Sequence, residues 1–219
     1  MLVPAQGCFP VPEAISDADA ALLEPLGVAL HAVDLGRLRL ARSVAVLGCG
    51  PIGLLVIRLA QLAGADPIYA CDCFPWRAQL AEAWGAGEVW CCANEDSVGR
   101  VRELTGGRGV DVVFEAAWGA ESIAEAAEMA CPGGRVVLVG IPSQDMLTMK
   151  HSTARRKGLT ILMSRRMKHT YPRAIRLALG GALELEALIS RRYPLQHTAA
   201  AFASYAAWEP GVQKLLIEP

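Results

Sequence analysis

The residues SVAVLGCGPIG at positions 43–53 give the clearest indication of the fold. Its first half is rich in valine and other apolar residues, which is typical of a short buried strand. Gly48, Gly50 and Gly53 follow in the pattern G-x-G-x-x-G and lead into a helical segment. In this context the first glycine permits a tight turn, the second lets a pyrophosphate approach the backbone, and the third allows the helix to pack closely on the strand. The stretch therefore predicts a dinucleotide-binding turn.

Outward from this turn, short apolar runs alternate with longer helical ones. The strand candidates are 43–48, 67–71, 88–92, 111–115, 135–140 and 159–163. The helix candidates between them are 52–63, 76–84, 95–104 and 121–130. The strand candidates are apolar throughout, which indicates strands covered on both faces. The alternation predicts an α/β fold with a doubly wound parallel sheet, a Rossmann fold of six strands.

Linking segments flank the predicted sheet on both sides. Upstream, Ser16 followed by Asp19 predicts the start of a helix, and Pro25 suits the first turn of a second helical piece that runs to about residue 35. Downstream, helix, strand, helix and strand are expected at 171–179, 188–195, 198–206 and 212–217. We expect three units: leading helices at 1–40, the nucleotide-binding domain at 41–168 and a C-terminal return segment at 169–219.

Composition narrows the class of protein. The 219 residues carry 21 basic and 22 acidic side chains, and 53% are hydrophobic. This balance gives no general attraction for nucleic acid or an anionic membrane, and it excludes a disordered chain. Apolar runs end well before 18 residues, which predicts no membrane span, and the first ten residues lack the features of a secretory signal. With seven cysteines, an odd number mostly in strand-like runs, we expect a cytoplasmic protein with reduced thiols.

An acidic residue stands where the nucleotide-binding fingerprint needs one. Asp72 follows Gly53 by 19 residues, at the end of the second predicted strand. Its carboxylate would accept hydrogen bonds from the adenosine ribose and repel a 2′-phosphate, which favours NAD over NADP. Arg77 is either a ribose-side partner of Asp72 or a solvated residue at the start of the next helix.

Residues at the ends of the fourth and fifth predicted strands complete the expected cofactor site. Ligands of open α/β sheets bind outside the carboxyl ends of the strands. There, Ala116 follows the fourth strand, Gly140 ends the fifth, and Ile141 follows it. Their backbone groups could hold a nicotinamide ring. The expected cofactor contacts also include Pro51 and Ile52, which open the helix after the glycine turn.

Several further segments resemble those of one enzyme family. They are LEPL at 23–26, GRGVDVVFE at 107–115, GGRVVLVG at 133–140 and RYPL at 192–195. With the glycine turn and Asp72, they make the chain similar to the coenzyme-binding half of the zinc-type medium-chain dehydrogenases, which include alcohol, sorbitol and threonine dehydrogenases. The resemblance implies an NAD-dependent oxidoreductase that transfers a hydride between an alcohol or polyol substrate and NAD.

The resemblance also implies roles for three residues outside the nucleotide motif. Glu24 matches a residue of the catalytic zinc site, with a plain helix-end carboxylate as the equal alternative. Arg165 matches a substrate-facing, catalytic position, and Lys214 matches a basic residue that reaches the cofactor pyrophosphate. The other zinc ligands of the family lie in a GroES-like domain, expected before residue 1, and a catalytic zinc needs about three protein ligands. We therefore expect these 219 residues alone to bind NAD(H) with little or no dehydrogenase activity.

Two other functions compete with this interpretation. A stand-alone nucleotide-binding or assembly module that has lost catalysis would account for the missing zinc ligands. A methyltransferase also uses a glycine turn and an acidic strand end, but the Pro51-Ile52-Gly53 helix start argues against it. Members of the family pair their sixth strands across a two-fold axis, so we expect a homo-dimer or tetramer through the apolar edge strand 159–163.

Overall fold

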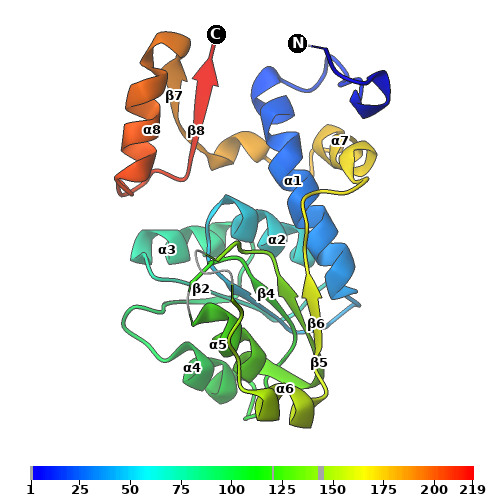
Figure 1. Ribbon diagram of the computed structural model, residues 1–219, viewed down its shortest axis with the longest axis vertical. Coiled ribbons are helices and arrows are strands. Elements are labelled where there is room, and N and C mark those ends of the chain that lie inside the picture. The colour runs from blue at the N-terminus through cyan, green and yellow to red at the C-terminus, as the bar shows by residue number, and fades with distance from the viewer. Residues whose placement is uncertain (1, 120, 143–145) are drawn as a thin grey trace.

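A six-stranded parallel sheet forms the centre of the computed structural model, which describes residues 2–119, 121–142 and 146–219 (Figure 1). Its strand order is β3-β2-β1-β4-β5-β6. The strands are β1 Val44–Leu47, β2 Ile68–Asp72, β3 Glu88–Cys91, β4 Val110–Glu115, β5 Ala130–Leu138 and β6 Thr160–Met163. This confirms the predicted Rossmann fold. The predicted units 1–40 and 41–168 include the residues outside the described ranges, and their boundaries stay predictions.

Helices cover both faces of the sheet. They are α2 Pro51–Leu62, α3 Pro75–Ala83, α4 Ser97–Leu104, α5 Ser122–Met129 and α6 His151–Lys157. Strand β1 shows the consequence for the core, because all four of its residues are buried. Val44 and Val46 belong to a core shared with α2, while Ala45 and Leu47 belong to a second core shared with α5. The uniformly apolar strands thus line two cores, as the sequence indicates.

The first long helix corrects one prediction. Helix α1 runs unbroken over Asp17–Gly36, with Pro25 inside it, instead of starting a second piece at the proline. Ser16 caps it as expected, since its Oγ accepts a 3.0 Å hydrogen bond from the amide of Asp19. Leu22 and Leu26 on either side of Pro25 are buried in the core. Packing of this face outweighs the one backbone hydrogen bond that a proline removes.

Helix α6 is an α-helix that the sequence pattern did not predict. It is short, and its sequence, HSTARRK, contains no apolar periodicity. Side-chain contacts with the neighbouring α5 hold it in place: Lys157 Nζ donates to the carbonyls of Ala127 and Glu128, and Thr153 Oγ1 donates to the Glu128 carboxylate. Such long-range polar contacts leave no local signal in the sequence.

The C-terminal return segment forms a second, small sheet. After α7 Tyr171–Leu179 the chain continues through β7 Ile189–Pro194, α8 Thr198–Ala206 and β8 Lys214–Glu218. The expected order of helix, strand, helix and strand is confirmed. Strands β7 and β8 pair in parallel. In Figure 1 these two strands and α8 lie at the upper left, above α3. Within the described ranges, no helix combines the length and hydropathy needed to cross a bilayer.

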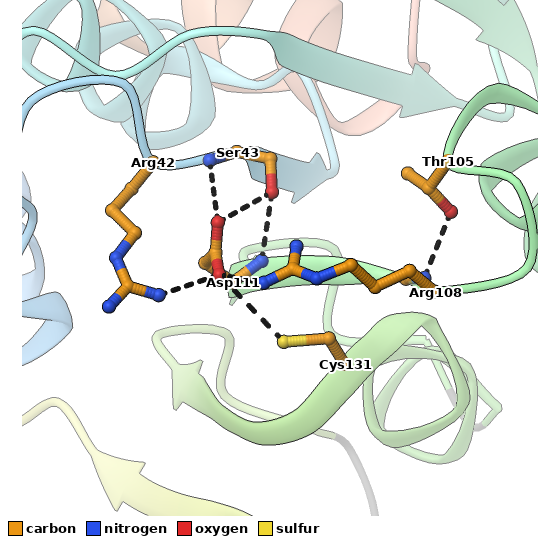
Figure 2. A network of polar contacts seen from close by, with 7 residues as sticks. Arg42, Ser43, Thr105, Arg108, Asp111 and Cys131 are labelled. Atoms are coloured by element: carbon orange, nitrogen blue, oxygen red, sulfur yellow. Dashed lines mark hydrogen bonds and ion pairs between the residues drawn. The ribbon is translucent and has the colours of Figure 1, made fainter.

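A polar network around Asp111 fastens the amino end of β4 to the start of β1 (Figure 2). The Asp111 carboxylate accepts hydrogen bonds from the backbone amide and hydroxyl of Ser43, from Arg42 at 2.7 Å and from Arg108 at 2.6 Å. Burial alone would raise the pKa of Asp111, but these hydrogen bonds outweigh it and hold that pKa well below its ordinary value. The network has a structural role, because it lies at the amino ends of the strands, away from the carboxyl ends where open α/β sheets bind ligands.

Candidate functional site

The glycine turn has the geometry that its sequence pattern predicts. Gly48 has a φ of +93°, and a Cβ there would lie 2.8 Å from the backbone of Ala116. A Cβ on Gly53 would lie 1.8 Å from the carbonyl oxygen of Gly48. The helix therefore packs so close to the turn that only glycine fits at this position. A Cβ on Gly50 would meet nothing within 4 Å. The first and third glycines therefore shape the protein, while the second faces open space that a ligand can enter.

Helix α2 points its amino end into this open space. Gly50 is its N-cap, and Pro51 occupies the first turn, where a missing backbone N–H costs nothing. No side chain caps the helix. Its free backbone N–H groups and the positive end of its dipole form an arrangement that suits a phosphate group.

Asp72 ends β2 beside this turn, and its side chain is only 7% exposed. Its Oδ2 accepts a 2.8 Å hydrogen bond from the amide of Cys49, and its Oδ1 accepts one of 2.9 Å from the amide of Phe74. Each carboxylate oxygen can accept a further hydrogen bond. Asp72 thus orders the turn as well as offering lone pairs to a ligand, a double role that its spacing from Gly53 did not indicate.

Arg77 is 8% exposed, which makes the solvated alternative wrong. Its guanidinium carbon lies 5.1 to 5.3 Å from the ring centroids of Phe74, Trp76 and Trp208. We call these three rings the aromatic cage. Among the described residues no ion pair joins Arg77 to Asp72, and the buried Nε of Arg77 has no hydrogen-bond partner there. The cage holds the cation through its ring faces and leaves donor capacity free.

Two adjoining cavities lie along the carboxyl ends of the strands. The first, of about 510 Å³, is lined by Gly48, Gly50, Asp72, Arg77 and Ala116, with aromatic and cysteine neighbours. The second, of about 620 Å³, is lined by Gly50, Pro51, Ile52, Arg77, Ala116, Gly140 and Ile141. Trp118 and Trp208 line both. The fold therefore brings together every predicted cofactor residue except Gly53 and Lys214.

Those two residues lie apart from the cavities. Gly53 is buried beneath the turn, where its role is the close packing described above. Lys214 begins β8 in the second sheet, and its backbone amide donates to Ser190 Oγ. Neither residue lines the crevice, so the pyrophosphate contact expected of Lys214 has no support in this geometry.

Glu24 and Arg165 share a separate cavity of about 370 Å³, lined also by Arg166, Met167 and Lys168. Both residues are exposed. No group of three or more His, Cys, Asp or Glu side chains that could hold a metal occurs in the part of the chain that the structure describes. One carboxylate among three cationic side chains does not fit a zinc ion. Glu24 and Arg165, to which the resemblance gives separate roles, thus line one cavity, and their roles stay predictions.

Two residues that sequence reasoning missed hold the crevice in shape. Glu115 at the end of β4 is fully buried, and its Oε1 accepts hydrogen bonds from the amides of Ala117 and Trp118 and from the hydroxyl of Ser122. Gln213 donates from Nε2 to the carbonyl of Cys49 at 2.7 Å, across 164 residues of sequence. A carboxylate at a strand end is a local signal for the first, whereas nothing local indicates the second.

The arrangement defines a class of site. Strands β1 and β4 are parallel neighbours at the centre of the sheet, and the chain continues from them in opposite directions across it, to β2 and to β5. The glycine turn, the α2 amino end and both cavities lie at this switch point. The acidic residue Asp72 lines one cavity, and the small or apolar residues Ala116, Gly140 and Ile141 line the other. The fold and the form of the crevice are typical of dinucleotide-binding Rossmann proteins.

Comparison with known proteins narrows this class. Residues 51–180 match the family model described as zinc-binding dehydrogenase. Sorbitol dehydrogenase of Bacillus subtilis (strain 168) is 28% identical over 211 residues, which make up 96% of this chain and 60% of that enzyme. The chain belongs to the zinc-binding dehydrogenase family, and it spans about 60% of the length of this curated relative.

Solved structures agree with this assignment. A zinc-binding dehydrogenase from Sinorhizobium meliloti 1021 bound to NADP superposes with a TM-score of 0.89 at 31% identity, over 99% of this chain and 64% of that one. An alcohol dehydrogenase from Escherichia coli CFT073 complexed with NADH superposes with a TM-score of 0.92 at 25% identity, again over 99% and 64%. Both similarities extend over the return segment as well as the main sheet.

Proposed function

We propose that the crevice binds NAD(H) in an extended conformation. The adenosine half would occupy the cavity at Asp72 and the aromatic cage, the pyrophosphate the open face of Gly50, and the nicotinamide the cavity at Gly140 and Ile141. The observation that carries this proposal is the position of Gly50, which lines both cavities and has open space where its Cβ would be. A dinucleotide has this shape, with two ring systems joined by a pyrophosphate.

The charges near the adenosine cavity favour NAD over NADP. Asp72 places a carboxylate where a 2′-phosphate would lie, and the repulsion would disfavour the phosphorylated cofactor. Arg77 is the cation that could offset this repulsion. Its guanidinium lies against three aromatic rings and, among the described residues, forms no ion pair with Asp72. The negative charge of Asp72 is therefore not neutralised by an ion pair with Arg77, which supports NAD as the preferred form.

Hydride transfer to or from an alcohol or polyol is our proposal for the whole enzyme to which this crevice would belong. NAD supplies the hydride acceptor at its nicotinamide carbon when it is bound. The chain's own contribution would be to bind and orient the ring against the walls formed by Ala116, Gly140 and Ile141. Glu115, which fixes the loop after β4, would hold that wall in position.

We also propose a cytoplasmic homo-oligomer assembled through β6. Among the described strands, β6 pairs only with β5, so it forms an edge of the sheet. The Met163 side chain at its end is 61% exposed. An edge strand that presents apolar side chains favours pairing with a second copy, and sedimentation that gives a strict monomer would contradict this.

Calorimetry with NADH and NADPH tests the cofactor proposal directly. We expect NADH to bind at micromolar to submillimolar concentration and NADPH to bind more weakly. Energy transfer from the tryptophans that line both cavities, Trp118 and Trp208, to the bound reduced nicotinamide would give an independent signal. Absence of NADH binding at millimolar concentration would overturn the proposal.

A further inference from the structure

Two cysteines face each other where β2 and β3 end. The strands run in parallel, with Asp72 opposite Cys91 as their last registered pair. The next residues along the two strands are Cys73 and Cys92. The amide of Cys92 still donates to the carbonyl of Asp72 at 3.1 Å, so the ladder of backbone hydrogen bonds continues to this point. The Sγ atoms of Cys73 and Cys92 lie 3.0 Å apart.

This geometry is close to that of a disulfide. Neighbouring strands are about 4.8 Å apart, within the Cα separation of about 4.4 to 6.8 Å that a disulfide requires. The two sulfurs would have to approach by only about 1 Å to reach the usual bond length of about 2.05 Å. The backbone therefore already has the spacing, and a small side-chain movement would complete the bond.

The same two thiols belong to a larger cysteine group, in which Cys73 is the most exposed member and Cys91, like Cys92, is half-buried. Cys73 is exposed and Cys92 is half-buried, whereas Cys49 and Cys71 are buried. Cys91 donates to the carbonyl of Cys73 at 3.3 Å, so its thiol is directed at the backbone. An oxidant from solvent would meet Cys73 first, with Cys92 as the nearest second thiol.

We propose that Cys73 and Cys92 form a reversible dithiol site that a small-molecule disulfide of the glutathione type oxidises. Cys73 attacks the small disulfide, which releases one small thiol and leaves a mixed disulfide on Cys73. The Cys92 sulfur then attacks the Cys73 sulfur and releases the second small thiol. In balance, the two protein thiols lose two electrons and two protons, and the small disulfide gains them as two thiols.

The bond would form in the wall of the cofactor crevice. Both cysteines line the cavity of about 510 Å³. Cys73 also lies between Asp72, which orders the glycine turn, and Phe74, which belongs to the aromatic cage. Because the backbone already has the spacing, the bond would leave Asp72 and Phe74 in place but would cross-link the crevice wall beside them. Oxidation should therefore weaken NADH binding, a consequence that rests on the proposed function.

The reaction should be slow at neutral pH. Burial, together with the hydrogen bond to Cys92, raises the pKa of Cys73 to about 12. A hydrogen bond with Cys71, together with burial, raises the pKa of Cys92 above its ordinary value. Because the thiolate is the attacking form, few molecules react at any moment. Incubation over hours at pH 8 is the suitable condition.

Peptide mapping of the full 219-residue protein tests the site itself. After treatment with oxidised glutathione and alkylation, trypsin cleavage at Arg77 separates peptide 59–77, which holds Cys71 and Cys73, from peptide 78–100, which holds Cys91 and Cys92. We expect these two peptides to be joined, with a mass lower by two hydrogens, and to separate on reduction. Only glutathione adducts, with no joined peptides, would overturn the proposal.

Serine variants assign the bond to its two sulfurs. Cys73→Ser and Cys92→Ser should each abolish the joined peptides. Cys71→Ser and Cys91→Ser are the matched controls on the same two peptides and should keep them. Cys8→Ser removes the distant exposed thiol and should also leave the link intact. A link that survives in Cys73→Ser would contradict the assignment.

The binding consequence is measured separately. We expect the oxidised protein to bind NADH at least several-fold more weakly than its own reduced form, with recovery after reduction, and the Cys73→Ser protein to respond to neither treatment. Equal affinity of both forms would overturn the coupling to the crevice. If the reduced protein binds no NADH, the cofactor proposal fails, while the peptide map still decides whether the dithiol site exists.

Discussion

The Oδ2 of Asp72 accepts a 2.8 Å hydrogen bond from the backbone amide of Cys49. This contact joins the carboxyl end of β2 to the glycine turn after β1, although 23 residues separate the two in sequence. The carboxylate that would select the ribose therefore also positions the turn that would receive the pyrophosphate. A change at Asp72 should affect both halves of cofactor recognition.

Asp72→Asn should lower NADH affinity about tenfold. The neutral amide loses the charge-assisted hydrogen bonds to the ribose and to Cys49, which are worth about 1.5 kcal/mol or more. It should also narrow the preference for NADH over NADPH, because the repulsion of a 2′-phosphate is removed. Calorimetry with both cofactors measures this. Asp66→Asn, an exposed position just before the same strand, is the matched control and should leave both affinities unchanged.

The glycine turn offers a pair of substitutions with opposite outcomes. Gly53→Ala should destabilise the protein by about 3 kcal/mol or more, because its Cβ would meet the carbonyl oxygen of Gly48. Gly50→Ala should leave thermal stability nearly unchanged, since open space surrounds that position, but it should weaken NADH binding by placing a methyl group in the crevice. Thermal unfolding and calorimetry separate the two effects. A Gly50→Ala protein with full NADH affinity would argue against a pyrophosphate at this turn.

The Asp111 network should make stability depend on acid pH. Because its pKa in the folded state is lowered, Asp111 contributes stability above the unfolded-state pKa of about 4 and loses it as the pH falls through the folded-state value. Asp111→Asn should therefore cost on the order of 2 kcal/mol at pH 7. The difference from the unmodified protein should shrink below pH 4. Urea unfolding at pH 7, 5, 4 and 3 checks the trend, and a constant difference would contradict it.

Gln213 connects the return segment to the cofactor turn. Gln213→Ala should cost about 1 to 2 kcal/mol of stability, because the buried carbonyl of Cys49 loses its donor. It should also weaken NADH binding by loosening the turn. Gln196→Ala, an exposed glutamine in the same segment, should change neither quantity. Loss of stability with unchanged NADH affinity would limit Gln213 to a structural role.

Local pattern was sufficient for most of the fold. The uniformly apolar runs predicted six strands, and the alternation with helices predicted their parallel order, because each rule depends only on residues close in sequence. It failed where distant contacts decide the outcome. Pro25 predicted a helix start but lies inside α1, since the burial of Leu22 and Leu26 stabilises the continuous helix.

The features of the site also fall into those that local sequence predicts and those that distant contacts decide. The glycine turn, the acidic end of β2 and the residues at the ends of β4 and β5 could be predicted from sequence patterns, because the carboxyl ends of parallel strands necessarily meet at one end of the sheet. Tertiary structure alone decided that Arg77 is enclosed by an aromatic cage completed by Trp208 and that Cys73 faces Cys92. It also decided that Gln213 reaches Cys49. These contacts depend on strand register and on the packing of the return segment, which no local periodicity encodes.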